Sequence, residues 1–403
     1  MSSIEAAVFG HHEADPRALL YYEWCQRGES GYAVADFAED VNELSLADRP
    51  MDAACWRLLD RVESAARVPE WPYFEWIDTG GDPNIIGVAR DSPAYPTPAD
   101  YSRAELYDRI HGGWLGRCAG CALAGPHDTG VIGCPRDENL DYTILGLHLL
   151  EQYGTHFIAD DVAALWLERL PFLRTSTAER VAYRNLIDGF LPPDTASYRN
   201  PYREWRGALV RADIYGYTNP GNPARAAELA ARDAAISHTG NGLWAARWAA
   251  ALVAAAFTAE RPPEALARAH TVIPANSRLA VALSEVVDDH AHNLAWQHAV
   301  TGIHTRHARY NRLHAVGNAC LVAAGLLWGE GDFTETVQLV VRSGWDVNTN
   351  AATAGSIAGI LTGAAHIPAH WTDPLENTLH SAVTGYPSTR ISDLAIRTHH
   401  LLP

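Results

Sequence analysis

The stretch that decides the fold is 344-GWDVNTNAATAGSIAGILTGAAHIPAHW-371. It begins with a polar turn rich in Asp, Asn and Thr and continues as an apolar helix in which Gly355, Gly359 and Gly363 recur every four residues. Small residues at this spacing share one helix face and let a second helix approach closely. A polar turn on such a rigid frame supplies the oxygen atoms that a hard cation needs.

A second glycine-rich stretch, 109-RIHGGWLGRCAGCALAGPHD-128, has the same character. Glycine is a poor helix former, so its concentration in a helical context implies close approach of two backbones. From Ser102 onward, alanine- and leucine-rich segments alternate with short Pro, Gly and Asn breaks, and few alternating β-type runs occur. The sequence therefore predicts an all-α, compact helical bundle over residues 101–403.

The first hundred residues read differently and predict a small helical extension. The segments 18–28, 35–47 and 52–68 have the pattern of two or three short amphipathic helices. The prolines of GVARDSPAYPTPADYS, over 87–102, mark a linker before the main body. We expect a boundary near residue 100, and nothing in the extension indicates a chemical role.

The composition of the chain limits the kinds of molecule that it can bind. The chain of 403 residues has a formal net charge of -17, which disfavours binding to nucleic acid. It has no apolar run long enough to span a membrane, its N-terminus has no signal-peptide pattern, and its six cysteines are scattered. We expect a soluble cytoplasmic protein with reduced cysteines. An anionic small molecule stays possible as a ligand, because a few arginines in one cleft can outweigh a distant acidic surface.

The ordered motifs resemble those of the ADP-ribosylglycohydrolase family over residues 102–398. The family signature Gly-x-Asp-x-Asp-Thr is matched by Gly344, Asp346 and Thr349, whereas Asn348 replaces its second aspartate. The segment 137-DENLDYT-143 resembles the acidic motif at the start of another family helix. Capping of that helix by carboxylates is the structural alternative for these acidic residues.

The resemblance implies an all-α enzyme that breaks the N-glycosidic bond at a ribose C1, and it implies magnesium. The metal positions would be Asp141, Asp346, Asn348 and Thr349. Because Cys121, Tyr142, Ala246 and Asn348 stand where relatives carry charged or ligating residues, we expect one Mg²⁺ or none rather than two.

The resemblance also assigns roles to individual residues. Asp141, Glu138 and Asp346 are the catalytic candidates, with Glu138 or Asp137 as the base that activates water. The candidates for substrate binding come from the helix start at 137, from the Arg-, Asn- and Tyr-rich segment 177–257, and from the turn at 344; they are Asn139, Asn200, Arg203, Glu204, Arg211, His238, Asn241 and Trp345. Ordinary surface loops are the alternative for any one of these residues.

Several functions stay open at this point. The chain could be a hydrolase with a rearranged metal site, an enzyme that acts without metal on a small nucleotide, or a relative that binds an ADP-ribose-like ligand without catalysis. The short segment between Pro126 and Asp137 suggests an altered pocket mouth. We therefore expect a small ADP-ribose- or NAD-derived substrate, with a protein ADP-ribosylhydrolase as the alternative.

Overall fold

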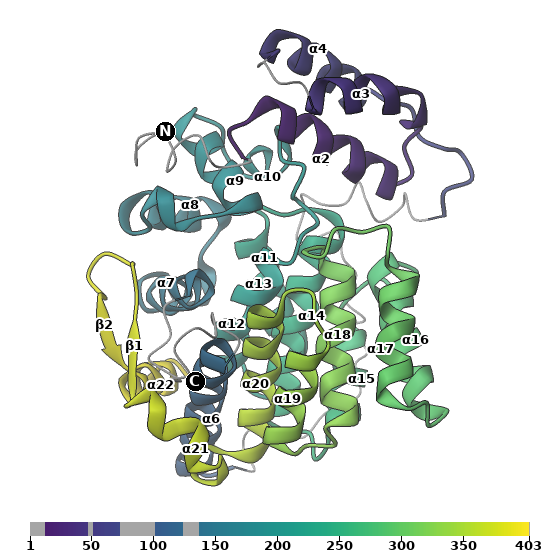
Figure 1. The fold of residues 1–403 in the computed structure, drawn as a ribbon. Coiled ribbons are helices and arrows are strands. Elements are labelled where there is room, and N and C mark those ends of the chain that lie inside the picture. Colours follow the sequence, from purple (N-terminus) through teal and green to yellow (C-terminus); the bar gives the residue numbers. More distant parts are fainter. Residues whose placement is uncertain (1–12, 47–50, 73–100, 124–136, 403) are drawn as a thin grey trace.

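The chain folds as the predicted all-α bundle (Figure 1). The structure is a computed structural model, and it describes residues 13–46, 51–72, 101–123 and 137–402. The body is a thick layer of helices around α14 (Gly240–Ala256), and every residue of that helix is buried. Its alanine-rich sequence explains this position, since a helix of small apolar residues can be surrounded closely on all sides.

The two glycine-rich stretches form a single antiparallel helix pair, α6 (Arg103–Leu123) and α20 (Val347–Thr362). A Cβ added at Gly116 would collide with the carbonyl oxygen of Gly355, and one added at Gly112 would collide with that of Gly359. The two backbones therefore touch, which confirms the close approach predicted from the glycine spacing.

The other elements of the body surround this pair and α14. They are α7 (Glu138–Tyr153), η4 (Gly154–His156), α8 (Ala159–Arg169), η5 (Phe172–Arg174), α9 (Thr177–Ile187), α10 (Asp194–Ser197), α11 (Gly207–Arg211), α12 (Asp213–Tyr217), α13 (Pro223–Ala234), α15 (Pro262–His270), α16 (Arg278–Ala291), α17 (Trp296–Arg306), α18 (Ala315–Trp328), α19 (Phe333–Arg342), η6 (Ala364–His366), α21 (Ala369–Thr372), η7 (Asp373–Leu375) and α22 (Ile391–His400).

A short antiparallel hairpin interrupts the helices near the C-terminus. Strands β1 (Thr378–His380) and β2 (Ser388–Arg390) pair with Leu379 opposite Thr389. The hairpin lies beside α7 (Figure 1), and the loop that joins its strands contacts Asp141 through the backbone N–H of Ala382.

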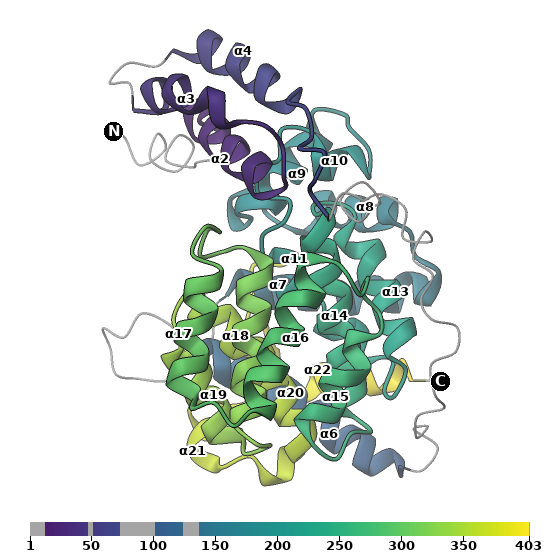
Figure 2. The same ribbon diagram turned by 90° about the vertical axis from the view of Figure 1, so that its right-hand side faces the viewer.

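The N-terminal helices pack on one end of the body, as Figure 2 shows. They are α2 (Pro16–Glu29), η1 (Ala35–Phe37), α3 (Ala38–Ser45) and α4 (Asp52–Glu63), close to the three predicted segments. Leu19, Leu20 and Val41 share a buried apolar cluster with Tyr202 and Trp205 of the body. The predicted proline-rich linker lies outside the described residues.

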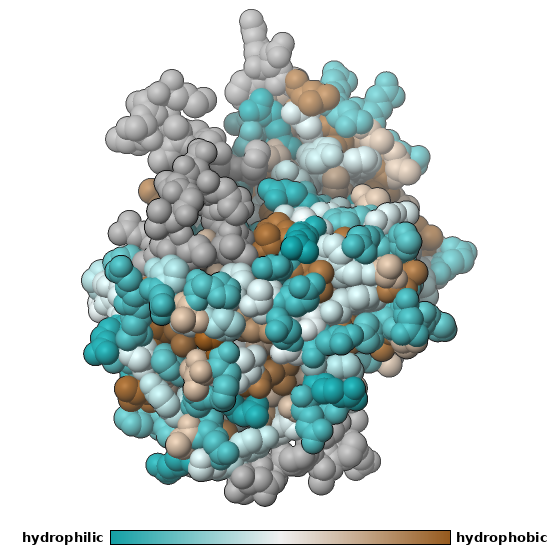
Figure 3. All heavy atoms as spheres, turned by 60° about the horizontal axis from the view of Figure 1, so that its bottom comes forward, coloured by the Kyte–Doolittle hydropathy of each residue, from teal (hydrophilic) through white to brown (hydrophobic). Residues whose placement is uncertain are grey.

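The surface of the far end of the body carries mixed side chains. In Figure 3, apolar residues are interspersed with polar ones rather than gathered in one broad patch. Among the described residues, no helix is long and apolar enough to cross a membrane.

Candidate functional site

The first turn of α7 positions Glu138. Asp137 caps this helix, because its carboxylate accepts a hydrogen bond from the backbone N–H of Asn139 at 2.8 Å. The side chain of Glu138 is half-buried and accepts a hydrogen bond from the Ser176 hydroxyl at 2.7 Å. Burial raises the pKa of Glu138 to about 7, and the nearby charge of Arg206 opposes that rise. Glu138 is therefore a carboxyl that can take or release a proton near neutral pH.

The first turn of α20 positions Asp346. Gly344 and Trp345 have φ values of 80° and 56°, so the chain makes a left-handed turn directly before the helix. Asp346 follows as the N-cap residue, but its carboxylate caps no backbone N–H and instead forms an ion pair with the guanidinium of Arg206. A non-glycine residue at positive φ is held there by its surroundings, which fixes the direction of the next side chain.

Backbone hydrogen bonds hold residues 204–206 against residues 313–315. The Arg206 N–H donates to the carbonyl oxygen of Leu313 at 2.9 Å, and the Ala315 N–H donates to that of Glu204 at 3.0 Å. Burial tends to lower the pKa of Arg206, but the carboxylates of Asp346 and Glu138 outweigh it and raise the pKa. Arg206 therefore stays charged between the starts of α7 and α20.

A second arginine lies deeper in the body. Arg211 contacts Glu179 at 2.7 Å and Asp233 at 2.6 Å, and all three side chains are buried. Burial raises the pKa of Glu179 despite this ion pair. We call Glu138, Glu179, Asp233, Asp346, Arg206 and Arg211 the carboxylate–arginine cluster. Four carboxyls face two guanidiniums in it, so the cluster has an excess of acidic groups.

Within the described structure, Glu138 is the one carboxyl of this cluster that makes no ion pair. The side chains of Arg206 and Asp346 are 12 % and 14 % exposed, so this pair of the cluster reaches solvent. A half-buried carboxyl beside a fixed positive charge, open to water on one side, is an arrangement suited to proton transfer.

The structure separates the predicted residues of α7. Asp141 is fully buried; its Oδ1 accepts from the Ala382 N–H at 2.9 Å, and its Oδ2 lies 3.5 Å from a guanidinium nitrogen of Arg174. Burial raises the pKa of Asp141. Asn139 is also buried and donates to Asp137. Of the predicted catalytic residues, Asp346 pairs with Arg206 and Glu138 lies close enough to feel the charge of Arg206, whereas the contacts of Asp141 lead to the hairpin loop and η5.

The residues predicted around Asp346 stay beside it. The Thr349 hydroxyl donates to the Asp346 carbonyl oxygen at 3.1 Å, and Asn348 is half-buried in the same turn. The ring of Trp345 is half-buried, meets His304 edge-on at 5.1 Å between centroids, and covers Gly317. The roles predicted for these three residues stay predictions.

The predicted substrate-binding residues of segment 177–257 make contacts within the protein. Asn200 donates to the Ser237 carbonyl oxygen at 3.0 Å, and the ring of His238 contacts the Ser237 hydroxyl at 2.8 Å. Glu204 pairs with Arg278 and accepts from Asn241 at 3.1 Å. Burial alone would raise the pKa of Glu204, but Arg278 and His314 outweigh it and lower the pKa to about 2.

Arg203 of the same segment reaches into the extension. Its guanidinium contacts both oxygens of Glu23 in α2, at 2.6 and 3.1 Å. Together with Arg211, these contacts fasten the segment 200–211 to α2, α9, α14 and α16. The part of these residues in ligand binding stays a prediction.

Sequence reasoning did not single out Arg206, Glu179 or Ser176. Arg206 directly follows the stretch 200–205, which contains the predicted residues Asn200, Arg203 and Glu204, and that neighbourhood was the available signal. Cys121 is buried near the end of α6. Pro126 and the short segment that follows it lie outside the described residues.

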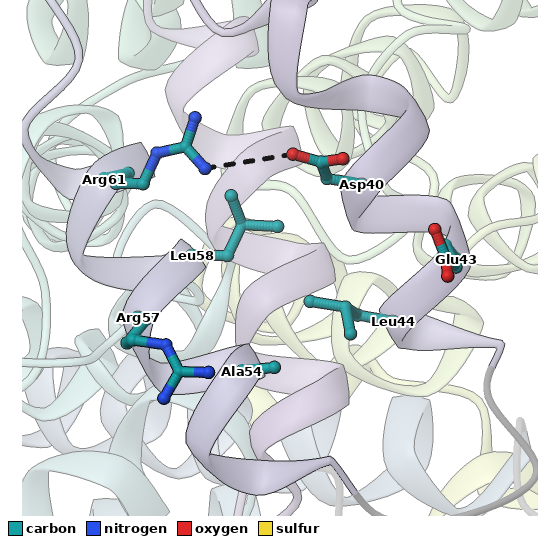
Figure 4. A pocket seen from close by; sticks show the side chains of 7 residues that line it. All are labelled: Asp40, Glu43, Leu44, Ala54, Arg57, Leu58 and Arg61. Carbon is teal, nitrogen blue, oxygen red and sulfur yellow. Dashed lines mark ion pairs between the residues drawn. The ribbon is translucent and has the colours of Figure 1, made fainter.

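A separate hollow lies in the extension, between α3 and α4 (Figure 4). Acidic side chains from α3 face basic ones from α4 across it, with Asp40 and Arg61 3.8 Å apart. None of the predicted site residues lines this hollow, so it is distinct from the carboxylate–arginine cluster.

Comparisons with known proteins agree with the arrangement of the body. Residues 102–402 match the family model described as ADP-ribosylglycohydrolase. A solved structure described as an ADP-ribosylglycohydrolase-related protein complex is similar with a TM-score of 0.50 and 22 % identity, over 74 % of this chain and 99 % of the other. No match was found among curated protein sequences.

Proposed function

Since the chain belongs to the ADP-ribosylglycohydrolase family, we propose that it hydrolyses the N-glycosidic bond between a ribose C1 and nitrogen in a small ADP-ribose- or NAD-derived nucleotide. The observation that carries this proposal is the partly exposed ion pair of Asp346 with Arg206, whose charge also acts on Glu138 at the start of α7. The two carboxyls come from helix starts that are far apart in sequence, and both starts carry motifs that resemble those of the family.

In the proposed reaction, water supplies the atom that replaces nitrogen on C1. The C1–N bond breaks with its electron pair going to nitrogen, while the water oxygen forms a bond to C1. Glu138 takes one proton from that water and passes it to the departing nitrogen, or releases it to solvent when the leaving group is a pyridinium that departs as a neutral base. A ribose hydroxyl and the free nitrogen compound result. Glu138 suits the role of base, because its pKa of about 7 leaves a substantial fraction ionised at neutral pH.

The remaining groups of the cluster favour the charge that develops on the sugar. The transition state for loss of nitrogen from C1 resembles an oxocarbenium ion, which a nearby excess of carboxylates stabilises. Asp346 supplies negative charge, and Arg206 holds its carboxylate in a fixed direction. The Ser176 hydroxyl holds Glu138 by a hydrogen bond. Preorganised charges of this kind need no rearrangement during the reaction.

The test is turnover of a substrate panel by the full chain. The panel holds NAD⁺, N-ribosides and ADP-ribosyl peptides, and product is detected as free ribose or ADP-ribose. We expect turnover of a small nucleotide and a loss of kcat of at least about 100-fold in Glu138→Gln, the size typical for removal of a general base. Turnover of peptides alone would contradict the proposed substrate class.

The matched control for this variant is Glu151→Gln. Glu151 lies in the same helix, but near its far end, where it pairs with Arg397 at 2.7 Å. The same chemical change there should leave kcat within about twofold, since surface charge changes rarely act on a distant site. Equal activity of Glu138→Gln and wild type would overturn the assignment of Glu138.

A further inference from the structure

The family resemblance implies Mg²⁺, but the predicted ligands do not form one donor set in the structure. Asp141 directs its two oxygens to Ala382 and Arg174, whereas Asp346, Asn348 and Thr349 stand at the start of α20. In the described part of the chain, no three Asp, Glu, His or Cys side chains lie together as a metal site requires. The residues that the structure describes therefore do not fit the group that the resemblance implies.

The carboxylate of Asp346 already has a cation. Nε of Arg206 donates to its Oδ2, and the two side chains form a largely buried ion pair. A divalent ion at this carboxylate would sit beside a guanidinium, and like charges repel strongly where little water screens them. Arginine also cannot relieve that repulsion by releasing its proton at any ordinary pH, because its pKa is raised further here.

The guanidinium of Arg206 also has N–H groups that can form further hydrogen bonds. Its Nε is used by Asp346, but neither terminal nitrogen of Arg206 makes a hydrogen bond to any residue that the structure describes. The side chain is 12 % exposed, so these N–H groups can meet a ligand from solvent. A guanidinium with two free amino groups recognises phosphate or hydroxyl oxygens through paired hydrogen bonds.

We propose that Arg206 is the resident cation of this site: its guanidinium balances Asp346 and Glu138 and leaves no place for Mg²⁺. The inference deepens the proposed function, because it names the positive charge of the same site. Its test is a binding measurement, so it can fail while the proposed hydrolysis holds, and it can hold for a chain that catalyses nothing.

The experiment titrates Mg²⁺ and Mn²⁺ into the full chain by calorimetry, with Mn²⁺ also followed by its electron paramagnetic resonance signal. Wild type and Arg206→Lys, which keeps a positive charge, should bind neither ion below millimolar concentration. Arg206→Gln should gain at least a tenfold higher affinity, because Asp346 and Glu138 are then free to ligate. Arg206→Gln with Asp346→Asn should lose that gain.

Two controls separate this effect from general electrostatics. Arg306→Gln removes the same charge from an exposed pair with Asp289 and Glu285 and should leave divalent binding unchanged. The melting temperature of Asp346→Asn should fall equally in EDTA and in Mg²⁺, since the lost partner is an arginine. This second measurement still decides if Arg206→Gln does not fold.

Three results would overturn the inference. The first is micromolar binding of Mg²⁺ or Mn²⁺ by wild type that Asp346→Asn abolishes. The second is a folded Arg206→Gln that binds the ions no better than wild type. The third is a destabilisation by Asp346→Asn that appears in Mg²⁺ but not in EDTA, because a metal ion would then be the partner of this carboxylate.

Discussion

Arg203 and Glu23 are joined by two hydrogen bonds, 2.6 and 3.1 Å long, that tie the N-terminal extension to the body. Glu23 also pairs with Arg27 at 2.9 Å and is only 2 % exposed. Burial alone would raise the pKa of Glu23, but Arg203 and Arg27 outweigh it and lower the pKa. One carboxylate therefore serves two guanidiniums at the junction.

Replacement of Glu23 should strongly destabilise the protein. In Glu23→Gln, two largely buried guanidiniums lose their counter-charge, and removal of one partner of such a pair costs about 3 kcal/mol or more. The free energy of unfolding in urea measures the loss. Asp40→Asn is the matched control, because its pair with Arg61 is more than half exposed and 3.8 Å apart. Equal stability of the two variants would show that the junction contributes little.

The contribution of Glu29 to stability should fall as pH rises from about 5 to 8. Burial, and then the charge of Glu204, raise the pKa of Glu29 from 4.5 to about 8. A carboxyl with a raised pKa in the folded state stabilises that state fully below its unfolded pKa and loses this contribution as pH rises through the folded pKa. In Glu29→Gln, the free energy of unfolding should therefore depend less on pH, by up to about 1 kcal/mol per pH unit. An unchanged slope would contradict the assignment.

The contact between α6 and α20 should not tolerate even one methyl group. In Gly116→Ala, the added Cβ meets the carbonyl oxygen of Gly355, and such overpacking costs about 1–3 kcal/mol or more. Gly28→Ala is the control, because the Cβ meets only Val34 at 3.5 Å and alanine favours the helix by roughly 0.5 kcal/mol. The two melting temperatures should move in opposite directions, and a rise for Gly116→Ala would show that the helices can separate.

Removal of the Ser176 hydroxyl should move the acid limb of the pH–rate profile. That hydroxyl donates to Glu138 and lowers its pKa. In Ser176→Ala, the pKa of Glu138 should rise above about 7, so the acid limb of kcat should move to higher pH, with a smaller loss at alkaline pH. Ser64→Ala, at the end of α4, provides the control. An unmoved limb would separate Glu138 from the rate-determining proton transfer.

Much of the scaffold could be predicted because it depends on local pattern. Glycines four residues apart predicted that each of these helices is approached closely by another, and the structure shows that α6 and α20 are each other's partners. Amphipathic spacing predicted the helices of the extension. The spacing of glycines carries this information because only glycine allows two helix backbones to touch.

The partners of the charged residues could not be predicted in the same way. Arg206 meets Asp346 and lies near Glu138, and these residues are distant in the sequence. The sequence of segment 177–257 is the same whether one of its arginines faces a ligand or a buried carboxylate, so it does not reveal the partner. The motif match also pointed to Asp141, whereas the side chain that feels the charge of Arg206 is three residues earlier, because tertiary packing decides which side of α7 faces α11.

The pairing of α6 with α20 has a consequence for folding during synthesis, because α6 is made long before α20. Arg109 in α6 donates to the carbonyl oxygen of Ile360, 251 residues later, so the glycine face of α6 leaves the ribosome long before its partner exists. Contacts that close so late slow folding and leave apolar surface open to misassembly. A chain that stops before the end of α20 would therefore lack the helix that covers the glycine-rich face of α6.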